Sequence, residues 1–213
     1  MEVSKLEEVL NEIMFILNQR KEEEKEIKVG ISNRHIHLQK EHVEKLFGKE
    51  YILEKMKDLS QKGQYACKEV VTLCGPKGCI EKVRVLGPER KNTQVELSIG
   101  DCRKLGIETC VRMSGDLVGS AGLTIVGPNG SIQLLEGAIV SQRHIHMNMK
   151  DAEKFGVHDG EEVAIEILGE RGGILHKTIV RIDESFNLEC HLDVEEANAL
   201  GINSKTKVKI IKQ

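Results

Sequence analysis

One short sequence occurs twice in this chain of 213 residues and constrains its fold more than any other feature. The segment SNRHIH at Ser32–His37 returns as SQRHIH at Ser141–His146, with five of six residues identical. In a β-strand, residues i and i+2 point to the same face, so each His-Ile-His presents two imidazoles together and buries its isoleucine. Two adjacent imidazoles form half of a site for a metal such as zinc. The second copy disfavours the alternative of a strand with solvated histidines.

A longer repeat extends this pattern. Segments that start at Glu96, His146 and His191 share an apolar second residue, a helix-capping Ser, Asn or Asp, and a glycine ten residues on. A fourth copy starts at His37, with a weaker cap and its glycine one position later. Such a unit predicts a strand end, an N-cap, a short helix and a glycine that ends the helix. Because the repeat aligns Glu96 and His191 with the histidine pairs, both become candidate metal ligands.

The resulting set is too large for one tetrahedral ion and suits two ions with open coordination positions. Its members are His35, His37, Glu96, His144, His146 and His191. The alternative is a strand–helix module that simply repeats, with solvated polar ends. His42, His158 and His176 fall outside the repeat and are expected to be surface residues, and Cys190 is expected to face away from its neighbour His191.

The rest of the sequence predicts a mainly β protein with short helices. Strand-like segments rich in Val and Ile dominate after residue 27, and all three prolines follow a glycine in turn-forming pairs. This pattern favours barrels or a sandwich over a parallel α/β sheet. Residues 4–20 predict an amphipathic helix and residues 21–26 a charged linker. The alternative is that this helix packs on its own domain.

Composition excludes several classes of protein. A net charge of −3 and 3% aromatic residues argue against a nucleic-acid-binding surface. No apolar segment is long enough to predict a membrane-spanning helix, and the acidic N-terminal segment is unlike a targeting signal. The six cysteines include no CxxC pair, which argues against a zinc ribbon or a thioredoxin-like motif. Their irregular spacing is typical of reduced thiols in a cytosolic protein.

Three basic residues precede Glu96 in or between glycine-rich turns, namely Lys77, Arg84 and Arg90. Arg90 lies six residues before Glu96 and is the candidate to bind an oxyanion beside the metals. The alternative is a solvated basic face.

Four segments carry a resemblance to a known family: VGISNRHIHL at 29–38, RVLGPERKNTQVELS at 84–98, SQRHIHM at 141–147 and HLDVEEANALG at 191–201. They resemble the phosphate propanoyltransferases, the Pdu-type phosphotransacylases of bacterial microcompartments and propanediol degradation. The resemblance runs from about residue 27 to the C-terminus. It implies the reaction acyl-CoA + phosphate ⇌ acyl phosphate + CoA, with propanoyl-CoA or acetyl-CoA as substrate.

The resemblance also implies an architecture of two β-barrels capped by short α-helices, with the active site between them. One barrel is discontinuous and comprises residues 27–33 plus 142–213, the other comprises 34–141, and residues 1–26 precede them. A homodimer is implied. Residues 1–20 resemble an encapsulation peptide that contacts the shell or core proteins of a microcompartment, which would place the enzyme in the cytoplasm inside that compartment.

Site roles follow from the same resemblance. Two zinc ions per chain are implied, one on His35, His37 and Glu96 and the other on His144, His146 and His191. Arg90 is implied as the catalytic, phosphate-binding arginine. The implied CoA contacts are Gly30, Ile31, Ser32, Lys77, Arg84 and Asn198.

The predicted mechanism is direct attack of phosphate on the thioester. We hypothesise that the CoA sulfur binds the ion of His35, His37 and Glu96, and that the other ion holds phosphate with Arg90. The sequence has no nucleophile motif such as GxSxG, which leaves Cys190 as the rival nucleophile. Two alternatives are a dinuclear zinc thioesterase or other hydrolase, and a non-catalytic, zinc-stapled microcompartment module.

Overall fold

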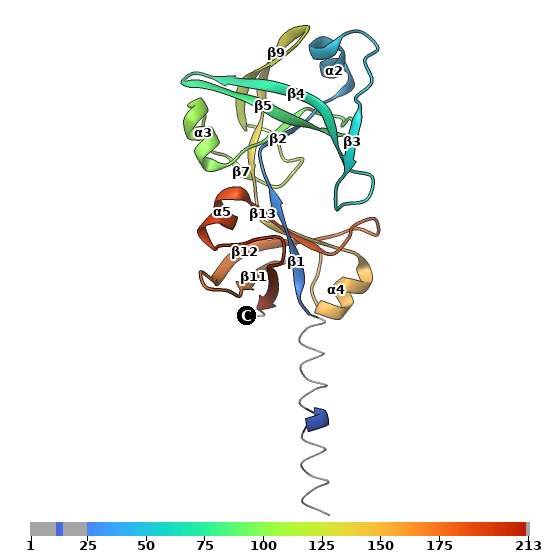
Figure 1. Ribbon diagram of the computed structural model, residues 1–213, viewed down its shortest axis with the longest axis vertical. Coiled ribbons are helices and arrows are strands. Elements are labelled where there is room, and N and C mark those ends of the chain that lie inside the picture. The colour runs from blue at the N-terminus through green and yellow to red at the C-terminus, as the bar shows by residue number, and fades with distance from the viewer. Residues whose placement is uncertain (1–11, 15–24, 212–213) are drawn as a thin grey trace, which may run out of the picture.

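The protein folds into two closed six-stranded β-barrels that are stacked along the long axis of the molecule (Figure 1). The computed structural model describes residues 12–14 and 25–211. Apart from residues 12–14, the expected N-terminal helix at 4–20 lies outside the described residues, as does most of the linker at 21–26. Among the described residues, none of the helices has the length and apolar character needed to cross a membrane.

The lower barrel in Figure 1 combines the start of the chain with its C-terminal third, in the strand order β1-β13-β10-β12-β11-β14. Its strands are β1 (Ile27–Ser32), β10 (His144–Met147), β11 (Glu162–Ile167), β12 (Gly173–Ile182), β13 (Glu189–Asp193) and β14 (Lys207–Ile211). The first strand, β1, runs parallel to β13 and antiparallel to β14, which closes the barrel. Its interior is aliphatic and includes Ile145, Ile165 and Val180, all fully buried.

The upper barrel closes through pairings of β4 with β5, β5 with β2, β2 with β6, β6 with β9, β9 with β8 and β8 with β4. These strands are β2 (His35–His37), β4 (Tyr65–Gly75), β5 (Gly78–Gly87), β6 (Gln94–Glu96), β8 (Ala121–Gly127) and β9 (Gly130–Ser141). Two further strands extend the sheet, β3 (Lys55–Asp58) beside β4 and β7 (Val111–Arg112) beside β9. The prediction of a mainly β fold with two barrels is therefore confirmed. The domain boundaries expected at 27–33 plus 142–213 and at 34–141 remain a proposal.

Each predicted strand–cap–helix unit forms a short helix after a strand. The helices are α2 (Lys40–Phe47), α3 (Ile99–Leu105), α4 (Met149–Phe155) and α5 (Val194–Ala199). Side chains of Ser98, Asn148 and Asp193 accept hydrogen bonds from backbone N–H groups in the first turns of α3, α4 and α5. These contacts satisfy donors that a helix otherwise leaves unpaired. Gln39 makes no such bond at the start of α2, in agreement with its weaker cap character.

Candidate active site

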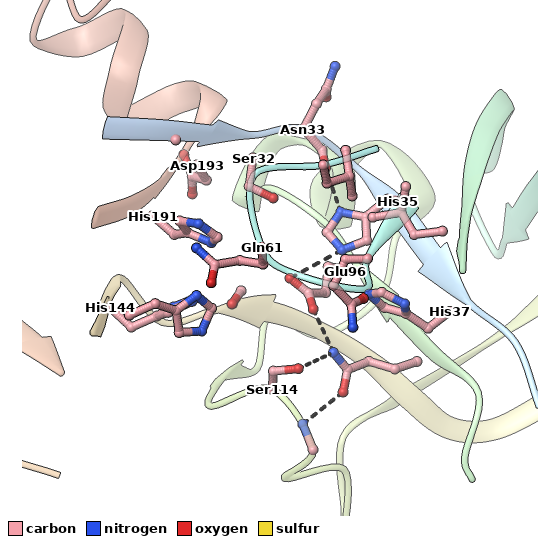
Figure 2. A pocket seen from close by; sticks show the side chains of 18 of the residues that line it. Ser32, Asn33, His35, His37, Gln61, Glu96, Ser114, His144, His191 and Asp193 are labelled. Atoms are coloured by element: carbon pink, nitrogen blue, oxygen red, sulfur yellow. Dashed lines mark hydrogen bonds and ion pairs between the residues drawn. The ribbon is translucent and has the colours of Figure 1, made fainter. Parts of the chain in front are cut away.

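Two groups of three candidate metal ligands lie at the ends of strands in different barrels. His35, His37 and Glu96 form one group, and His144, His146 and His191 form the other; within each group the candidate ligand atoms lie within 4.8 Å of one another. Figure 2 shows His144 and His191 on one side of the site and His35, His37 and Glu96 on the other. The structure therefore brings together all six residues that the repeat selected.

Both groups are built by the same strand pairing. In the upper barrel His35 lies directly opposite Glu96 in the antiparallel pair β2–β6. In the lower barrel His144 lies directly opposite His191 in the antiparallel pair β10–β13. Because residues opposite one another in such a pair have neighbouring side chains, the third ligand meets the first histidine of each His-Ile-His. The middle residues Ile36 and Ile145 are fully buried.

Hydrogen bonds to the backbone fix the tautomer of the first histidine in each group. Nδ1 of His35 lies 2.8 Å from the carbonyl oxygen of Asn33, and Nδ1 of His144 lies 2.8 Å from that of Gln142. A carbonyl oxygen only accepts, so Nδ1 carries the proton in both rings. In the neutral ring Nε2 then keeps its lone pair, which is the form of imidazole that binds a metal.

Burial keeps three histidines in the neutral, ligating form. It is the main cause that lowers the pKa of His37 to about 3, aided by His35 and Arg90. Burial and His191 lower the pKa of His144 to about 4, and burial with His144 and His191 lowers that of His146 to about 2. We call these the three neutral histidines.

Several buried ring nitrogens have no hydrogen-bond partner among the described residues. They are Nδ1 of His37 and both nitrogens of His146. Buried polar atoms are nearly always paired in native proteins, so an unpaired group of this kind calls for a ligand. Neutral imidazoles and an ionised carboxylate are also the donor set that zinc prefers. The residues present therefore fit a metal at each group.

Glu96 supplies the only negative charge among the six. Burial opposes its ionisation, but His35, His37 and Arg90 outweigh that effect and hold the pKa of the Glu96 carboxyl well below its usual range. Conversely, burial opposes protonation of His35, and the Glu96 carboxylate, 3.5 Å from its Nε2, outweighs it and raises the His35 pKa. The group that contains Glu96 is thus more negative than the all-histidine group.

The arginine of each repeated segment anchors the helix that follows the third ligand of its group. Nε of Arg34 lies 2.9 Å from an oxygen of Asp101, in the first turn of α3. Nε of Arg143 lies 2.7 Å from an oxygen of Glu196, in the first turn of α5. The two arginines therefore have a structural partner in matching positions, which explains their place in the repeat.

A network of polar side chains connects Arg90 with Glu96. Nη1 of Arg90 donates to Oγ of Ser114 at 3.2 Å, and Nε2 of Gln94 donates to the same Oγ at 2.8 Å. Nε2 of Gln94 also donates to Oε1 of Glu96 at 2.6 Å, and Oε1 of Gln94 accepts from the N–H of Gly115 at 2.8 Å. Figure 2 shows dashed bonds below Glu96, one of which ends on Ser114. Arg90, Gln94 and Glu96 are thus held in one rigid arrangement.

Sequence reasoning missed Gln94 and Glu189, although a signal was available. Gln94 lies two residues before Glu96 on β6, and Glu189 lies two residues before His191 on β13, so each shares a strand face with a third ligand. Oε2 of Glu189 lies 2.6 Å from Nε2 of His191. The i, i+2 rule that selected the histidine pairs selects these two residues as well.

A cavity of about 800 Å³ between the barrels contains both groups. Its lining includes ten predicted site residues: Gly30, Ile31, Ser32, His35, His37, Arg90, Glu96, His144, His146 and His191. Lys77, Arg84 and Asn198 do not line it. Arg84 instead donates to the backbone carbonyl oxygens of Cys67 and Lys68, at 3.1 and 2.7 Å. Of the three basic residues grouped from the sequence, only Arg90 reaches the cavity, where Arg181 also lies.

The three histidines outside the repeat, and Cys190, lie outside the two ligand groups. His158 and His176 are exposed, whereas His42 is half-buried with its Nδ1 2.7 Å from Oγ1 of Thr93. Cys190 is fully buried in the core of the lower barrel, on the opposite strand face from His191. Burial also raises the pKa of its thiol far above the usual range. The Cys190 sulfur therefore has neither the access nor the ionisation that a nucleophile needs.

Comparison with known proteins gives a consistent result. Residues 28–203 match the sequence model of the phosphate propanoyltransferase family. The chain is 50% identical over 186 residues to a phosphate propanoyltransferase of Rhodobacter capsulatus, which covers 87% of this chain and 86% of the relative. It is 47% identical over 208 residues to a protein of the same name from Clostridioides difficile. That alignment covers 98% of this chain and 100% of the relative. A third such relative, from Thermotoga maritima, is 50% identical over 184 residues, with 86% and 88% covered.

Proposed function

The chain belongs to the phosphate propanoyltransferase family, and from this we infer that it exchanges the CoA of an acyl-CoA for phosphate in its inter-barrel cavity. We propose that propanoyl-CoA, or acetyl-CoA, and phosphate react to give the acyl phosphate and CoA. The observation that carries this proposal is the convergence of two three-ligand groups and Arg90 on one cavity. A cavity of this volume is large enough for a small acyl thioester beside an anion.

We propose one zinc ion on His35, His37 and Glu96 and a second on His144, His146 and His191. A zinc ion with three protein ligands and an open position supplies Lewis-acid polarisation of oxygen and affinity for thiolate. The protein residues contribute the deprotonated ligand forms described above. The extra negative charge of Glu96 distinguishes the two groups, and the three neutral histidines need lose no proton at neutral pH.

Arg90 is the proposed phosphate-binding residue. Its guanidinium is permanently charged and presents several N–H donors, which matches the oxygens of phosphate. Ser114 and Gln94 hold the guanidinium in place, and the nearby Glu96 carboxylate offsets part of its charge. Arg90 would thereby orient one phosphate oxygen towards the thioester carbonyl, which lowers the entropic cost of the reaction.

The proposed bond changes involve the two substrates alone. A phosphate oxygen forms a bond to the carbonyl carbon, the carbon–sulfur bond breaks, and CoA leaves as its thiolate. The burial of Cys190 supports this direct transfer, because the thiol closest in sequence to the site is buried in the barrel core and does not line the cavity.

CoA is proposed to enter along the end of β1. Gly30, Ile31 and Ser32 line the cavity there, and Ile31 is 43% exposed. A Cβ at Gly30 would lie 2.9 Å from the Glu189 carboxyl carbon and 3.1 Å from the His191 ring, so only glycine leaves this approach open. Lys77, Arg84 and Asn198 lie outside the cavity, so their proposed contacts would be with the part of CoA that projects from it.

The proposals on oligomeric state and on location in the cell rest on the family resemblance. We propose a homodimer, and packaging of the enzyme inside a cytoplasmic bacterial microcompartment through residues 1–20. Light scattering of the purified protein measures the first. Fusion of residues 1–20 to a fluorescent reporter, followed by its co-purification with compartments, measures the second.

The decisive experiment measures metal content and phosphate dependence together. Purified protein is expected to contain two zinc ions per chain and to release CoA from propanoyl-CoA only when phosphate is present. Chelation is expected to abolish activity and to leave far-ultraviolet circular dichroism unchanged, because each barrel has its own aliphatic core. CoA release without phosphate would identify a thioesterase, and unfolding on chelation would identify a structural zinc module.

A further inference from the structure

The hairpin between β4 and β5 carries one cysteine on each strand beside its turn. Cys74 on β4 lies directly opposite Cys79 on β5, one position before the pair formed by Gly75 and Gly78. The Cys79 thiol donates a hydrogen bond to the Cys74 sulfur, and the two Sγ atoms are 2.9 Å apart. Opposed residues in an antiparallel pair have Cα atoms about 4.5–5.5 Å apart. That separation lies inside the range of about 4.4–6.8 Å that a disulfide spans, so the backbone needs little movement.

These two thiols differ from the other four, all of which lie in the described part of the chain. Cys79 is exposed and Cys74 half-buried, whereas Cys67, Cys102 and Cys190 are buried. The remaining Cys110 is half-buried and lies within electrostatic range of the buried Cys102, but no hydrogen bond joins their sulfurs among the described contacts. Access and a hydrogen-bonded thiol therefore coincide only at the hairpin.

We propose that Cys74 and Cys79 form a reversible intramolecular disulfide, a redox modification site outside the active-site cavity. The oxidant is a disulfide of a low-molecular-weight thiol. The Cys79 thiolate attacks one sulfur of that disulfide, which gives a mixed disulfide on Cys79 and releases the first small thiolate. The Cys74 thiolate then attacks the Cys79 sulfur, forms the internal disulfide and expels the second. The two protons lost by the cysteines end on the two released thiols, so the oxidant is fully reduced.

The order of these steps follows from the surroundings of each sulfur. Cys79 is the exposed partner, which lets a small disulfide approach it. Cys74 is half-buried, so it is the less accessible of the two as the first nucleophile. Once Cys79 carries the mixed disulfide, the short separation of the two sulfurs favours resolution by Cys74 over attack by a second external thiol.

The surrounding contacts hold the turn in the geometry that the reaction needs. The backbone N–H of Lys77 donates to the carbonyl oxygen of Leu105, the last residue of α3, at 3.0 Å. A Cβ at Gly75 would lie 2.3 Å from that same oxygen, so glycine is required for this close packing. The hairpin tip is thus fixed against α3. This packing keeps β4 and β5 paired at their ends, so the two thiols stay close together. None of the six candidate metal ligands is a thiol, so this oxidation leaves them chemically unchanged.

The test uses the full-length, metal-loaded protein and oxidised glutathione. After incubation, the protein is unfolded, alkylated and digested with trypsin without reduction. Cleavage after Lys77 separates the two cysteines, so the peptides 69–77 and 78–82 stay together only if the disulfide has formed. We expect this linked pair in the wild type, with four of the six cysteines alkylated and full reversal by dithiothreitol.

Two variants make the result specific. Cys74→Ser removes the resolving thiol and is expected to accumulate a stable glutathione adduct on Cys79. Cys110→Ser removes a half-buried cysteine elsewhere in the same barrel and is expected to give the linked peptides as the wild type does. The proposal is overturned if the wild type accumulates the Cys79 adduct as Cys74→Ser does, or if both hairpin thiols remain fully alkylatable after oxidation.

Discussion

Replacement of Gln94 by leucine tests whether the network beneath Glu96 holds that residue in its ligating position. Gln94 is 2% exposed and makes three hydrogen bonds, to Glu96, Ser114 and Gly115. The bond to the ionised Glu96 contributes roughly 1.5–3 kcal/mol and each neutral bond about 1 kcal/mol. Leucine is similar in volume, so the change removes these bonds without a large cavity. We expect Gln94→Leu to lower the free energy of unfolding by about 3–5 kcal/mol.

The diagnostic effect of the same change concerns metal affinity. Loss of a partner that orients a metal ligand typically weakens metal binding by about 10–100-fold. The Gln94 side chain hydrogen-bonds Glu96 and, among the described residues, no member of the all-histidine group. We therefore expect one of two zinc ions to be released at a 10–100-fold lower chelator concentration, and the other at the wild-type concentration. The Michaelis constant for phosphate is expected to rise as well, because Ser114, which also bonds Arg90, loses a partner.

The assay is a chelator titration followed with a zinc indicator dye, with urea denaturation in parallel. Gln133→Leu is the matched control, because Gln133 is an exposed glutamine on β9 of the same barrel. Among the described residues its side chain bonds only Thr124 and the backbone of Leu134. If Gln94→Leu releases both ions at the wild-type chelator concentration and keeps the wild-type Michaelis constant for phosphate, the positioning role of Gln94 is refuted.

Three further predictions concern the phosphate site, the rival nucleophile and the buried histidines. Arg90→Ala is expected to raise the Michaelis constant for phosphate at least about 10-fold while both metals are retained. Arg103→Ala, at an exposed arginine on α3, is its control, and unchanged phosphate saturation in Arg90→Ala would contradict the assignment. Cys190→Ala is expected to keep wild-type activity in the CoA-release assay and to lose about 1 kcal/mol of stability through its small cavity, whereas inactivity of the folded variant would restore Cys190 as a nucleophile. The third prediction concerns metal-free protein. In the unfolded chain, His37, His144 and His146 take up protons near pH 6.5, the ordinary pKa of histidine. In the folded state the same three side chains stay unprotonated until about pH 4 or below. The stability they contribute is therefore present above pH 6.5 and falls as pH decreases, by about 1.4 kcal/mol per pH unit for each histidine; urea denaturation at pH 7 and pH 5 that gave equal stability would contradict these pKa directions.

The sequence predicted the metal-ligand candidates because their signal is local and repeated. Strand alternation placed His35 with His37, and the shared cap and glycine aligned Glu96 with His191. The same local rules group Lys77 with Arg90 through their nearness to glycine-rich turns, but the structure places only Arg90 in the cavity. In the structure Lys77 lies on the β4–β5 turn against the end of α3, whereas Arg90 lies in the cavity. Spacing along the chain cannot show which side of a barrel a turn occupies.

The distance between the two ligand groups depends on contacts that no local pattern encodes. On one edge of the cavity, Gln61 donates to the carbonyl oxygen of Asn187 at 3.1 Å, and Ser60 and Gln61 both donate to the Glu189 carboxylate. These partners are 126 to 129 residues apart in sequence.

On another edge, Ser98 and the N–H of Gly100 donate to Oε1 of Glu195 at 2.8 and 3.0 Å. A Cβ at Gly100 would lie 2.3 Å from that oxygen, so glycine is required for the contact. Ser98 caps the helix after Glu96, and Glu195 lies in the helix after His191. The two repeated units are therefore bonded to each other through the helices that follow their third ligands. The repeated unit supplies each half of the site, and this contact between copies, together with that at Glu189, helps to hold the two halves around one cavity.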